Sequence, residues 1–197
     1  GSPSVDDLIY CGASDSFVTA LRTETGDLVW RTHVGGGVFA TPTVGDDLVF
    51  IASNDGLISA LSKADGATRW TYNTGAIANL SPTLCGEYLL TTSRQSVVTM
   101  LLAATGEKVW SDSTLAGQAI TSPVVVGDRI ILTDSRRSLI CLAPAKQDES
   151  VNTIDKTRKT RYIVCLPRLR ERWRKILCRP TTTVAALAAI ASRPFSR

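Results

Sequence analysis

The chain has 197 residues, which leaves room for one domain or two and excludes a longer series of domains. Hydrophobic residues make up 44% and charged residues 20%, the ordinary composition of a globular protein. The formal net charge of +4 conceals two unlike parts. Residues 1–142 carry 9 basic and 14 acidic side chains, a net of −5, whereas residues 143–197 carry 13 and 4, a net of +9. This asymmetry indicates that the second part is a separate segment with a different role.

A segment that ends in a tryptophan occurs three times at a constant spacing. Its copies are residues 20–30 (ALRTETGDLVW), 60–70 (ALSKADGATRW) and 100–110 (MLLAATGEKVW). Each copy has a glycine at the same place before its tryptophan, and these glycines are Gly26, Gly66 and Gly106. A fixed period of about 40 residues is typical of a propeller or of an array of repeats.

A proline marks the beginning of each repeat. Pro42 and Pro82 have the same spacing as the tryptophans, and Pro123 follows one position later than this spacing predicts. The N-terminal stretch SPSVDDLIYCGAS is the same segment with one residue missing, so Ser2-Pro3 fits the repeat and Gly1-Ser2 need not be an expression scar. Because the chain has no initiator methionine, we expect it to begin within an array or to be a processed product.

The second repeat is predicted to form four short antiparallel strands. Their predicted ranges are residues 37–44, 48–52, 57–62 and 67–73. The nearly continuous apolar run at 48–52 indicates a strand buried on both faces. An Asp-Gly pair in the next turn is typical of a hairpin. Four such strands in a repeat of about 40 residues make one blade of a β-propeller.

The repeated tryptophans have a predicted structural role. A four-stranded blade cannot bury both of its faces alone, so neighbouring blades must stack on it. We therefore predict that Trp30, Trp70 and Trp110 are equivalent residues buried between blades. The glycine before each tryptophan is predicted to supply a left-handed turn.

These motifs resemble the PQQ-like, or quinoprotein-type, β-propeller repeat. Its signature, the tryptophan-docking motif, reads A-L-D-x-x-T-G-x-x-x-W. Residues 20–30 match it well, whereas Asp65 replaces the threonine in the second copy and Met100 replaces the alanine in the third. The aspartate of the signature is replaced in all copies, by Arg22, Ser62 and Leu102. The resemblance covers residues 1–142 and implies an all-β fold, a partial propeller of about three and a half four-stranded antiparallel blades.

The fourth repeat stops short. After Leu142 a glycine and a tryptophan should follow, but Gln147 and Val151 stand near those positions. Propellers of the resembled family close with about six to eight blades, so this arc would leave two open edges. We expect the chain to be a fragment of a longer propeller, a truncated product, or an open arc completed by a partner.

Residues 143–197 are predicted to be a basic tail outside the propeller. Residues 147–161 are polar and predicted to be disordered, and residues 166–178 combine apolar and basic side chains at the spacing of an amphipathic helix. The apolar run at 184–191 is too short to span a bilayer. Because the tail begins within a blade, we favour a replaced continuation, through altered splicing or a shifted reading frame. The alternative is a functional segment that makes weak contact with an acidic surface or a membrane.

The sequence contains no recognisable catalytic, cofactor-binding or metal-binding constellation, so no such residue is assigned and no cofactor is expected. Dehydrogenases of the resembled family hold a quinone with a Ca²⁺ ligand set, an aspartate base and an adjacent Cys-Cys disulfide. Neither a Cys-Cys pair nor a haem CxxCH motif occurs here. Asp15, Asp55 and Asp134 fall in or near hairpin turns, where aspartate usually bonds to the backbone.

Other candidate residues have simpler interpretations. His33 is expected to be a solvated residue on an outer strand. The glycines at 35–37 are expected in a loop that leads to an inner strand, because no GK[ST] motif follows them. Arg136-Arg137 is expected in an exposed turn. The cysteines form no CxxC pair and are predicted to be free buried thiols, which with no visible signal peptide favours the cytoplasm; they are Cys11, Cys85, Cys141, Cys165 and Cys178.

Two functions remain open. The first is a non-catalytic propeller that serves as a protein-interaction or scaffold surface, as in outer-membrane-assembly lipoproteins or in propellers appended to acyl-activating enzymes. Its partner would be another protein or the remaining blades of the same propeller, with no specific nucleic acid. The alternative is a fragment of a quinoprotein dehydrogenase that lacks its catalytic blades. The missing catalytic signatures favour the first.

Overall fold

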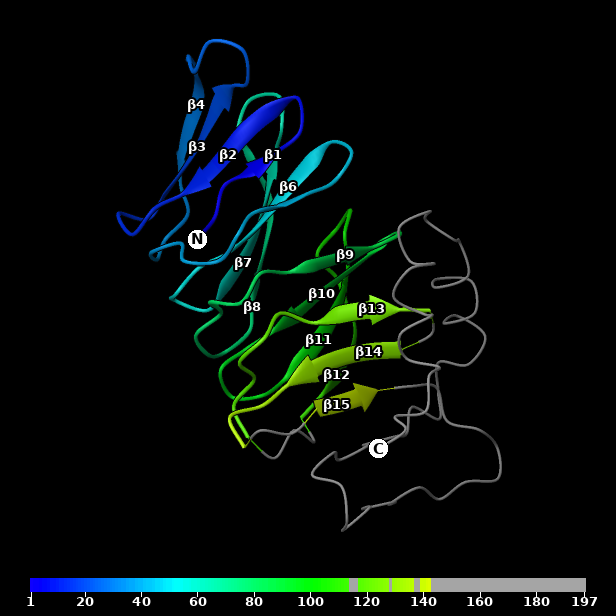
Figure 1. Cartoon of the computed structure of the whole chain (residues 1–197). Helices are drawn as coiled ribbons and strands as arrows, with labels where there is room; N and C mark the ends of the chain where they lie inside the picture. The colour runs from blue at the N-terminus through cyan, green and yellow to red at the C-terminus, as the bar shows by residue number, and fades with distance from the viewer. Residues whose placement is uncertain (114–116, 128, 137–138, 143–197) are drawn as a thin grey trace, which may run out of the picture.

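The computed structural model describes residues 1–113, 117–127, 129–136 and 139–142. The predicted tail at 143–197, with its predicted helix near 166–178, lies outside the described residues, as do Gln147 and Val151. Within the described ranges the regular secondary structure consists of β-strands, which form four separate sheets. Figure 1 shows the sheets following one another along the chain.

Each sheet is one blade, and neighbouring strands within it are antiparallel and consecutive in the chain. Blade 1 consists of β1 (Ser4–Val5), β2 (Leu8–Gly12), β3 (Phe17–Arg22) and β4 (Leu28–His33). Blade 2 consists of β5 (Thr43–Val44), β6 (Leu48–Ala52), β7 (Leu57–Ser62) and β8 (Thr68–Asn73). Blade 3 consists of β9 (Thr83–Cys85), β10 (Tyr88–Thr92), β11 (Val98–Leu102) and β12 (Lys108–Asp112). The described part of blade 4 consists of β13 (Val124–Val126), β14 (Arg129–Thr133) and β15 (Leu139–Leu142).

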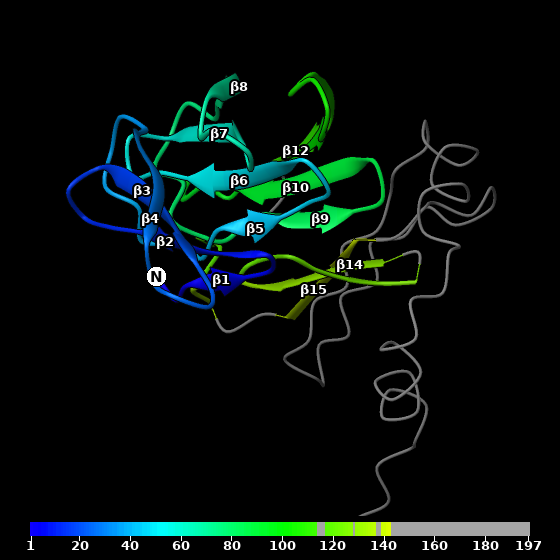
Figure 2. The same cartoon turned by 90° about the horizontal axis from the view of Figure 1, so that it is seen from above.

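This arrangement confirms the predicted fold class, an all-β partial propeller, of which the described residues form three four-stranded blades and three strands of a fourth. The first strands of successive blades contact one another, β1 with β5, β5 with β9, and β9 with β13. Figure 2 shows β5 and β9 side by side on the inner side of their blades. The first strands therefore line the inside of the arc, and the fourth strands lie outside.

The predicted strands of blade 2 agree with the structure in three of four cases. β6 and β7 have the predicted ranges, and β8 begins one residue later than predicted. The predicted first strand at 37–44 is wrong, because only Thr43–Val44 pairs as β5. Pro42 has no N–H to donate. The preceding residues bond to turns instead: Val38 N donates to Ala13 O, and Gly37 O accepts from Asn54 N, each at 2.9 Å.

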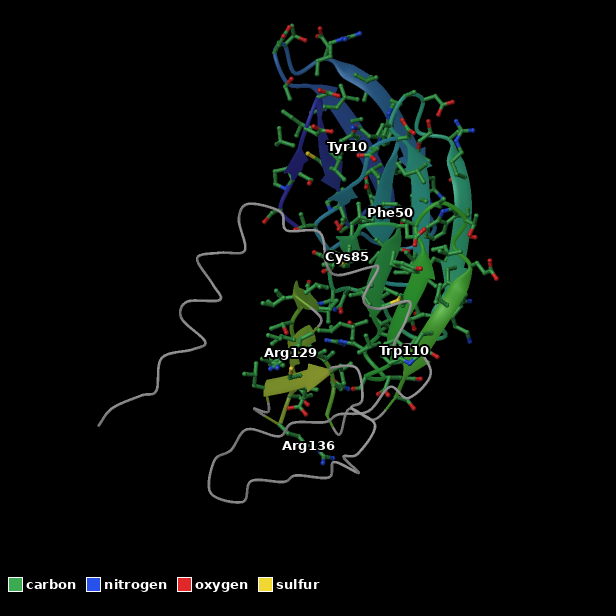
Figure 3. The ribbon with its side chains drawn as sticks, turned by 90° about the vertical axis from the view of Figure 1, so that its right-hand side faces the viewer. Tyr10, Phe50, Cys85, Trp110, Arg129 and Arg136 are labelled. Atoms are coloured by element: carbon green, nitrogen blue, oxygen red, sulfur yellow. The ribbon has the colours of Figure 1, made fainter. Side chains whose placement is uncertain are left out.

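The hydrophobic core lies between blades and not within any one of them. Three clusters of buried side chains fill the spaces between successive blades. Representative pairs across the three spaces are Tyr10 with Leu61, Phe50 with Leu101, and Leu90 with Ile130. Tyr10 and Phe50, both labelled in Figure 3, occupy equivalent positions on β2 and β6, opposite Ala20 and Ala60. Full burial of one such side chain contributes about 1.5–3 kcal/mol, so each blade depends on its neighbour for stability.

Hydrogen bonds also join the first strands of neighbouring blades. Thr43 Oγ1 donates to Pro82 O at 2.6 Å, and Thr83 Oγ1 donates to Pro123 O at 2.5 Å. Val124 stands at the equivalent position of blade 4 and has no hydroxyl to donate. The repeated threonine and proline thus form a second set of contacts between blades, which ends at blade 4.

Candidate interaction surfaces

The contact between blades 1 and 2 is built around Trp30. Its Nε1 donates to Lys63 O at 2.8 Å. A Cβ placed on Gly66 would come within 2.6 Å of two indole carbons, so the ring lies directly on this glycine. Thr32 Oγ1 donates to Gly66 O at 2.8 Å beside it. Lys63 Nζ pairs with Asp6 of blade 1 at 2.5 Å, and this hydrogen bond raises the pKa of Lys63.

The contact between blades 2 and 3 repeats this geometry. Trp70 Nε1 donates to Ala103 O at 2.9 Å, and a Cβ on Gly106 would again lie 2.6 Å from the indole. The three tryptophans are not equally buried, however, which corrects the prediction: Trp30 is 7% exposed, whereas Trp70 and Trp110 are half-buried. Ala103 stands where Lys63 stands in the first contact, so the second contact lacks a long side chain paired across the blades.

The repeated glycine therefore has two roles, of which the sequence predicted one. Gly26, Gly66 and Gly106 have φ of +76°, +70° and +73°, the predicted left-handed turn. The second role, receiving the indole of the preceding blade, was missed. A signal for it exists in the sequence, because Gly66 follows Trp30 at the same separation as Gly106 follows Trp70.

Blade 1 has the same receiving surface, but no indole lies on it among the described residues. A Cβ on Gly26 would meet nothing within 4 Å. Ile9, Cys11 and Leu21 are half-buried. Their counterparts in blade 2 are fully buried against blade 1, and these are Val49, Ile51 and Leu61. We call this surface of blade 1, marked by Ile9, Cys11, Leu21 and Gly26, the free face.

A second surface feature is a hollow between blades 3 and 4, with a volume of about 540 Å³. It is lined by residues 94–96, in the turn between β10 and β11, by residues 117–118, before β13, and by residues 135–136, after β14. Arg94 and Arg136 supply its two basic side chains. Figure 3 shows Arg136 at the end of blade 4, with its nitrogen atoms directed away from the strands.

Internal hydrogen bonds hold the lining of this hollow in place. Ser135 N donates to Gln118 O at 2.7 Å, and Gln118 N donates to Ser135 Oγ at 3.1 Å. Ser96 is buried, has a φ of +66°, and donates its hydroxyl to Gly117 O. These bonds connect a turn of blade 3 to the loop and the turn of blade 4.

The three aspartates singled out in the sequence bond to the backbone, as expected. Asp15 Oδ1 accepts from Phe17 N at 3.1 Å, and Asp55 Oδ1 accepts from Leu57 N at 3.4 Å. Asp134 Oδ1 accepts from Arg136 N at 3.0 Å. The structure does not bring these carboxylates together, because each serves the turn of its own blade.

The other candidates also lie where the sequence predicted. His33 is exposed at the end of β4, edge-on to Phe17 with ring centroids 5.2 Å apart. The glycines at 35–37 belong to the loop that leads to β5, and a Cβ on Gly35 would lie 2.4 Å from Asp55 Oδ2. Arg136 is in an exposed turn, and Arg137 lies outside the described residues.

The cysteines of the described blades lie apart. Cys11, Cys85 and Cys141 are on β2, β9 and β15, so they occupy different strand positions. All three are half-buried, which is less than predicted. Burial raises the pKa of the Cys85 thiol and so lowers its reactivity at neutral pH. Cys165 and Cys178 lie outside the described residues.

In residues 1–113, 117–127, 129–136 and 139–142, no group of three or more His, Cys, Asp or Glu side chains is placed to hold a metal ion. A hard cation such as Ca²⁺ takes six to eight oxygen ligands, and the aspartates near the turns are separated.

No helix among the described residues has the length and apolarity needed to cross a membrane.

Comparison with known proteins places this architecture in a family. The family model described as outer membrane protein assembly factor BamB matches residues 1–150. The solved structure of BamB from Moraxella catarrhalis is similar with a TM-score of 0.62 and 24% identity, over 68% of this chain and 43% of that one. Quinohemoprotein alcohol dehydrogenase from Comamonas testosteroni is similar with a TM-score of 0.51 and 23% identity, over 56% of this chain and 20% of that one. The computationally designed Ika4 protein is similar with a TM-score of 0.65 and 10% identity, over 71% of this chain and 87% of that one.

Because every identity is below 25%, these similarities show the fold alone. The chain spans less than half the length of Moraxella catarrhalis BamB. No curated protein matches the sequence at a significant level.

Proposed function

Because the chain belongs to the PQQ-like β-propeller family, we propose that it is a non-catalytic propeller module that works by binding protein. The observation that carries the proposal is the free face of blade 1. It has the glycine and the apolar strand residues that receive an indole elsewhere in the chain, and among the described residues no blade lies against it. The partner that fits this face is another blade of the same repeat, with a tryptophan on its fourth strand.

The two contacts within the chain support this choice of partner. Each one places an indole on a glycine and an indole N–H on a carbonyl oxygen three residues before that glycine. The corresponding carbonyl of blade 1 belongs to Thr23. A contact of this kind buries a large aromatic side chain and satisfies its one polar group, which is the combination enriched at protein interfaces. The name of the BamB relative, an assembly factor, is consistent with a protein-binding role.

Self-association of the full chain through the uncovered apolar residues of the free face gives a direct test of the proposal. We expect sedimentation velocity of the full chain to show association that increases with concentration, because Leu21, Ile9 and the 64%-exposed Val5 leave apolar area uncovered. Leu21→Lys places a charge in the free face and is expected to shift the chain to monomer. Thr71→Lys, on the exposed side of β8, is the charge-matched control and should associate as the unmodified chain does.

A chain that stays monomeric up to its solubility limit contradicts the proposal, as does a Leu21→Lys variant that associates normally. Thermal melting of both variants checks that each retains the fold.

The alternative function, part of a quinone-dependent dehydrogenase, has support only from likeness of fold to the Comamonas testosteroni enzyme. We expect no saturable binding when the full chain is titrated with the quinone and Ca²⁺ in excess, because the separated carboxylates of the described blades cannot form the required ligand set. Absorbance and intrinsic tryptophan fluorescence are suitable readouts. Saturable binding at micromolar concentrations would restore the dehydrogenase hypothesis.

A further inference from the structure

We propose that the hollow between blades 3 and 4 binds a short acidic peptide segment through Arg94 and Arg136. This site is separate from the free face of blade 1. The two surfaces lie on different blades, and they are tested by different measurements.

The charge of the hollow comes from a change at equivalent turns of the repeat. In blades 1 and 2 the turn between the second and third strands carries Asp15 and Asp55. Gln95 and Arg136 stand at these positions in blades 3 and 4, and Arg94 precedes Gln95. The turn between the second and third strands is thus acidic in blades 1 and 2 and basic in blades 3 and 4.

The two arginines have no carboxylate partner among the described residues. Three other basic side chains there are paired: Arg31 with Asp15, Lys63 with Asp6 and Arg69 with Asp65. Arg94 and Arg136 are exposed and take part in none of the ion pairs found in the described part of the chain. A guanidinium group presents a planar fork of donors that matches a carboxylate with two parallel hydrogen bonds.

The position of Arg136 is determined by its backbone and its aliphatic stem. Its N–H donates to Asp134 Oδ1, and Asp134 itself is only 1% exposed and does not line the hollow. A Cβ on Gly117 would lie 3.0 Å from Arg136 Cγ, so the stem passes close to this glycine. The floor groups Ser96 and Ser135 already bond within the protein, which leaves the side chains of Arg94, Gln95, Gln118 and Arg136 to meet a ligand.

The size and surroundings of the hollow favour a short acidic peptide over a long polyanion. Its volume of about 540 Å³ lies within the range of roughly 300–1,000 Å³ typical of ligand sites. Residues 1–142 carry a net charge of −5, so a long polyanion bound in the hollow would extend over acidic blades. A few carboxylates respond mainly to the nearest charges, because salt screens charges beyond about 8–10 Å. The chain's own residues 143–197 are unsuited as the occupant, since their net charge is +9.

Hydrogen exchange of the full chain tests the proposal, because it reports where a peptide binds. The probes are a short peptide of consecutive glutamates, its glutamine counterpart, and inorganic phosphate. We expect the glutamate peptide to slow amide exchange at residues 93–97 and 117–118, and the glutamine peptide to have no effect. Arg94→Gln and Arg136→Gln should each weaken the response by about two- to fivefold, the loss expected for an exposed ion pair. Arg22→Gln, at an exposed arginine of blade 1, is the matched control and should leave it unchanged.

Three outcomes overturn the proposal. The first is no slowing at these segments with the glutamate peptide, even if the peptide binds elsewhere, for example to residues 143–197. The second is an unchanged response in the variant that carries both arginine substitutions. The third is an equal response to inorganic phosphate at the same concentration, which would assign the hollow to phosphate. Exchange in β10 without peptide shows whether each variant has kept its fold.

Discussion

Trp30→Ala is expected to lower the free energy of unfolding by about 3–5 kcal/mol, the range for removing a large aromatic side chain from a core. The indole is 7% exposed, packs near Tyr10 with ring centroids 5.9 Å apart, and donates to Lys63 O. Its removal leaves Lys63 O without this donor and opens a cavity between blades 1 and 2. Denaturant unfolding followed by circular dichroism measures the change.

Trp30→Phe separates the two contributions. Phenylalanine retains an aromatic ring but has no N–H, so the loss should be smaller and include about 1 kcal/mol for the hydrogen bond. Trp70→Ala should be less destabilising than Trp30→Ala, because Trp70 is only half-buried. If Trp30→Ala changes the stability by less than about 1 kcal/mol, the role of the indole between blades is refuted.

Gly66→Ala is expected to destabilise the chain by about 2–5 kcal/mol through two effects, backbone strain and steric overlap. The first is a left-handed backbone, with φ of +70°, which costs about 1–2 kcal/mol for a residue with a Cβ. The second is overlap, because the new methyl would lie 2.6 Å from carbons of the Trp30 indole, and overpacking a core costs about 1–3 kcal/mol. Chemical denaturation of the variant measures the total.

Gly26→Ala is a matched control within the same chain. Gly26 has a similar φ of +76°, but its Cβ would meet nothing within 4 Å. Only the backbone effect should remain, so we expect about 1–2 kcal/mol. Equal losses for the two substitutions would mean that no ring lies on Gly66.

The repeat period predicts most of the architecture because a blade is a local structure. Strands such as Leu48–Ala52 are formed by residues close in sequence, and their apolar pattern and turn residues are visible in one repeat. The short β5 was mispredicted because Val38 and Gly37 bond to neighbouring turns, which no local pattern reveals. The unequal burial of Trp30 and Trp70 accompanies a difference between Lys63 and Ala103, which belong to the blade that follows each tryptophan.

The surface features were harder to predict than the blades. The hollow combines turns of two different blades with a loop, and Arg94 and Arg136 belong to different repeats. Only an alignment of the turns, in which Asp15 and Asp55 correspond to Gln95 and Arg136, would have pointed to it. The free face was anticipated only as an open edge. The receiving role of Gly26 requires knowing that an indole lies on Gly66 and Gly106.

The central claim is that the indole of one blade rests on the glycine of the next, and a double-mutant cycle of Trp30→Ala and Gly66→Ala tests it most directly. In the Trp30→Ala background the overlap with the indole is gone and only the overlap with Thr32 Oγ1, also 2.6 Å from the new methyl, remains, so Gly66→Ala should cost less than it does in the unmodified chain. The two substitutions should therefore be non-additive by about 1–3 kcal/mol, the coupling expected for residues in contact. Additivity within about 0.5 kcal/mol, as for distant sites, would contradict the claim.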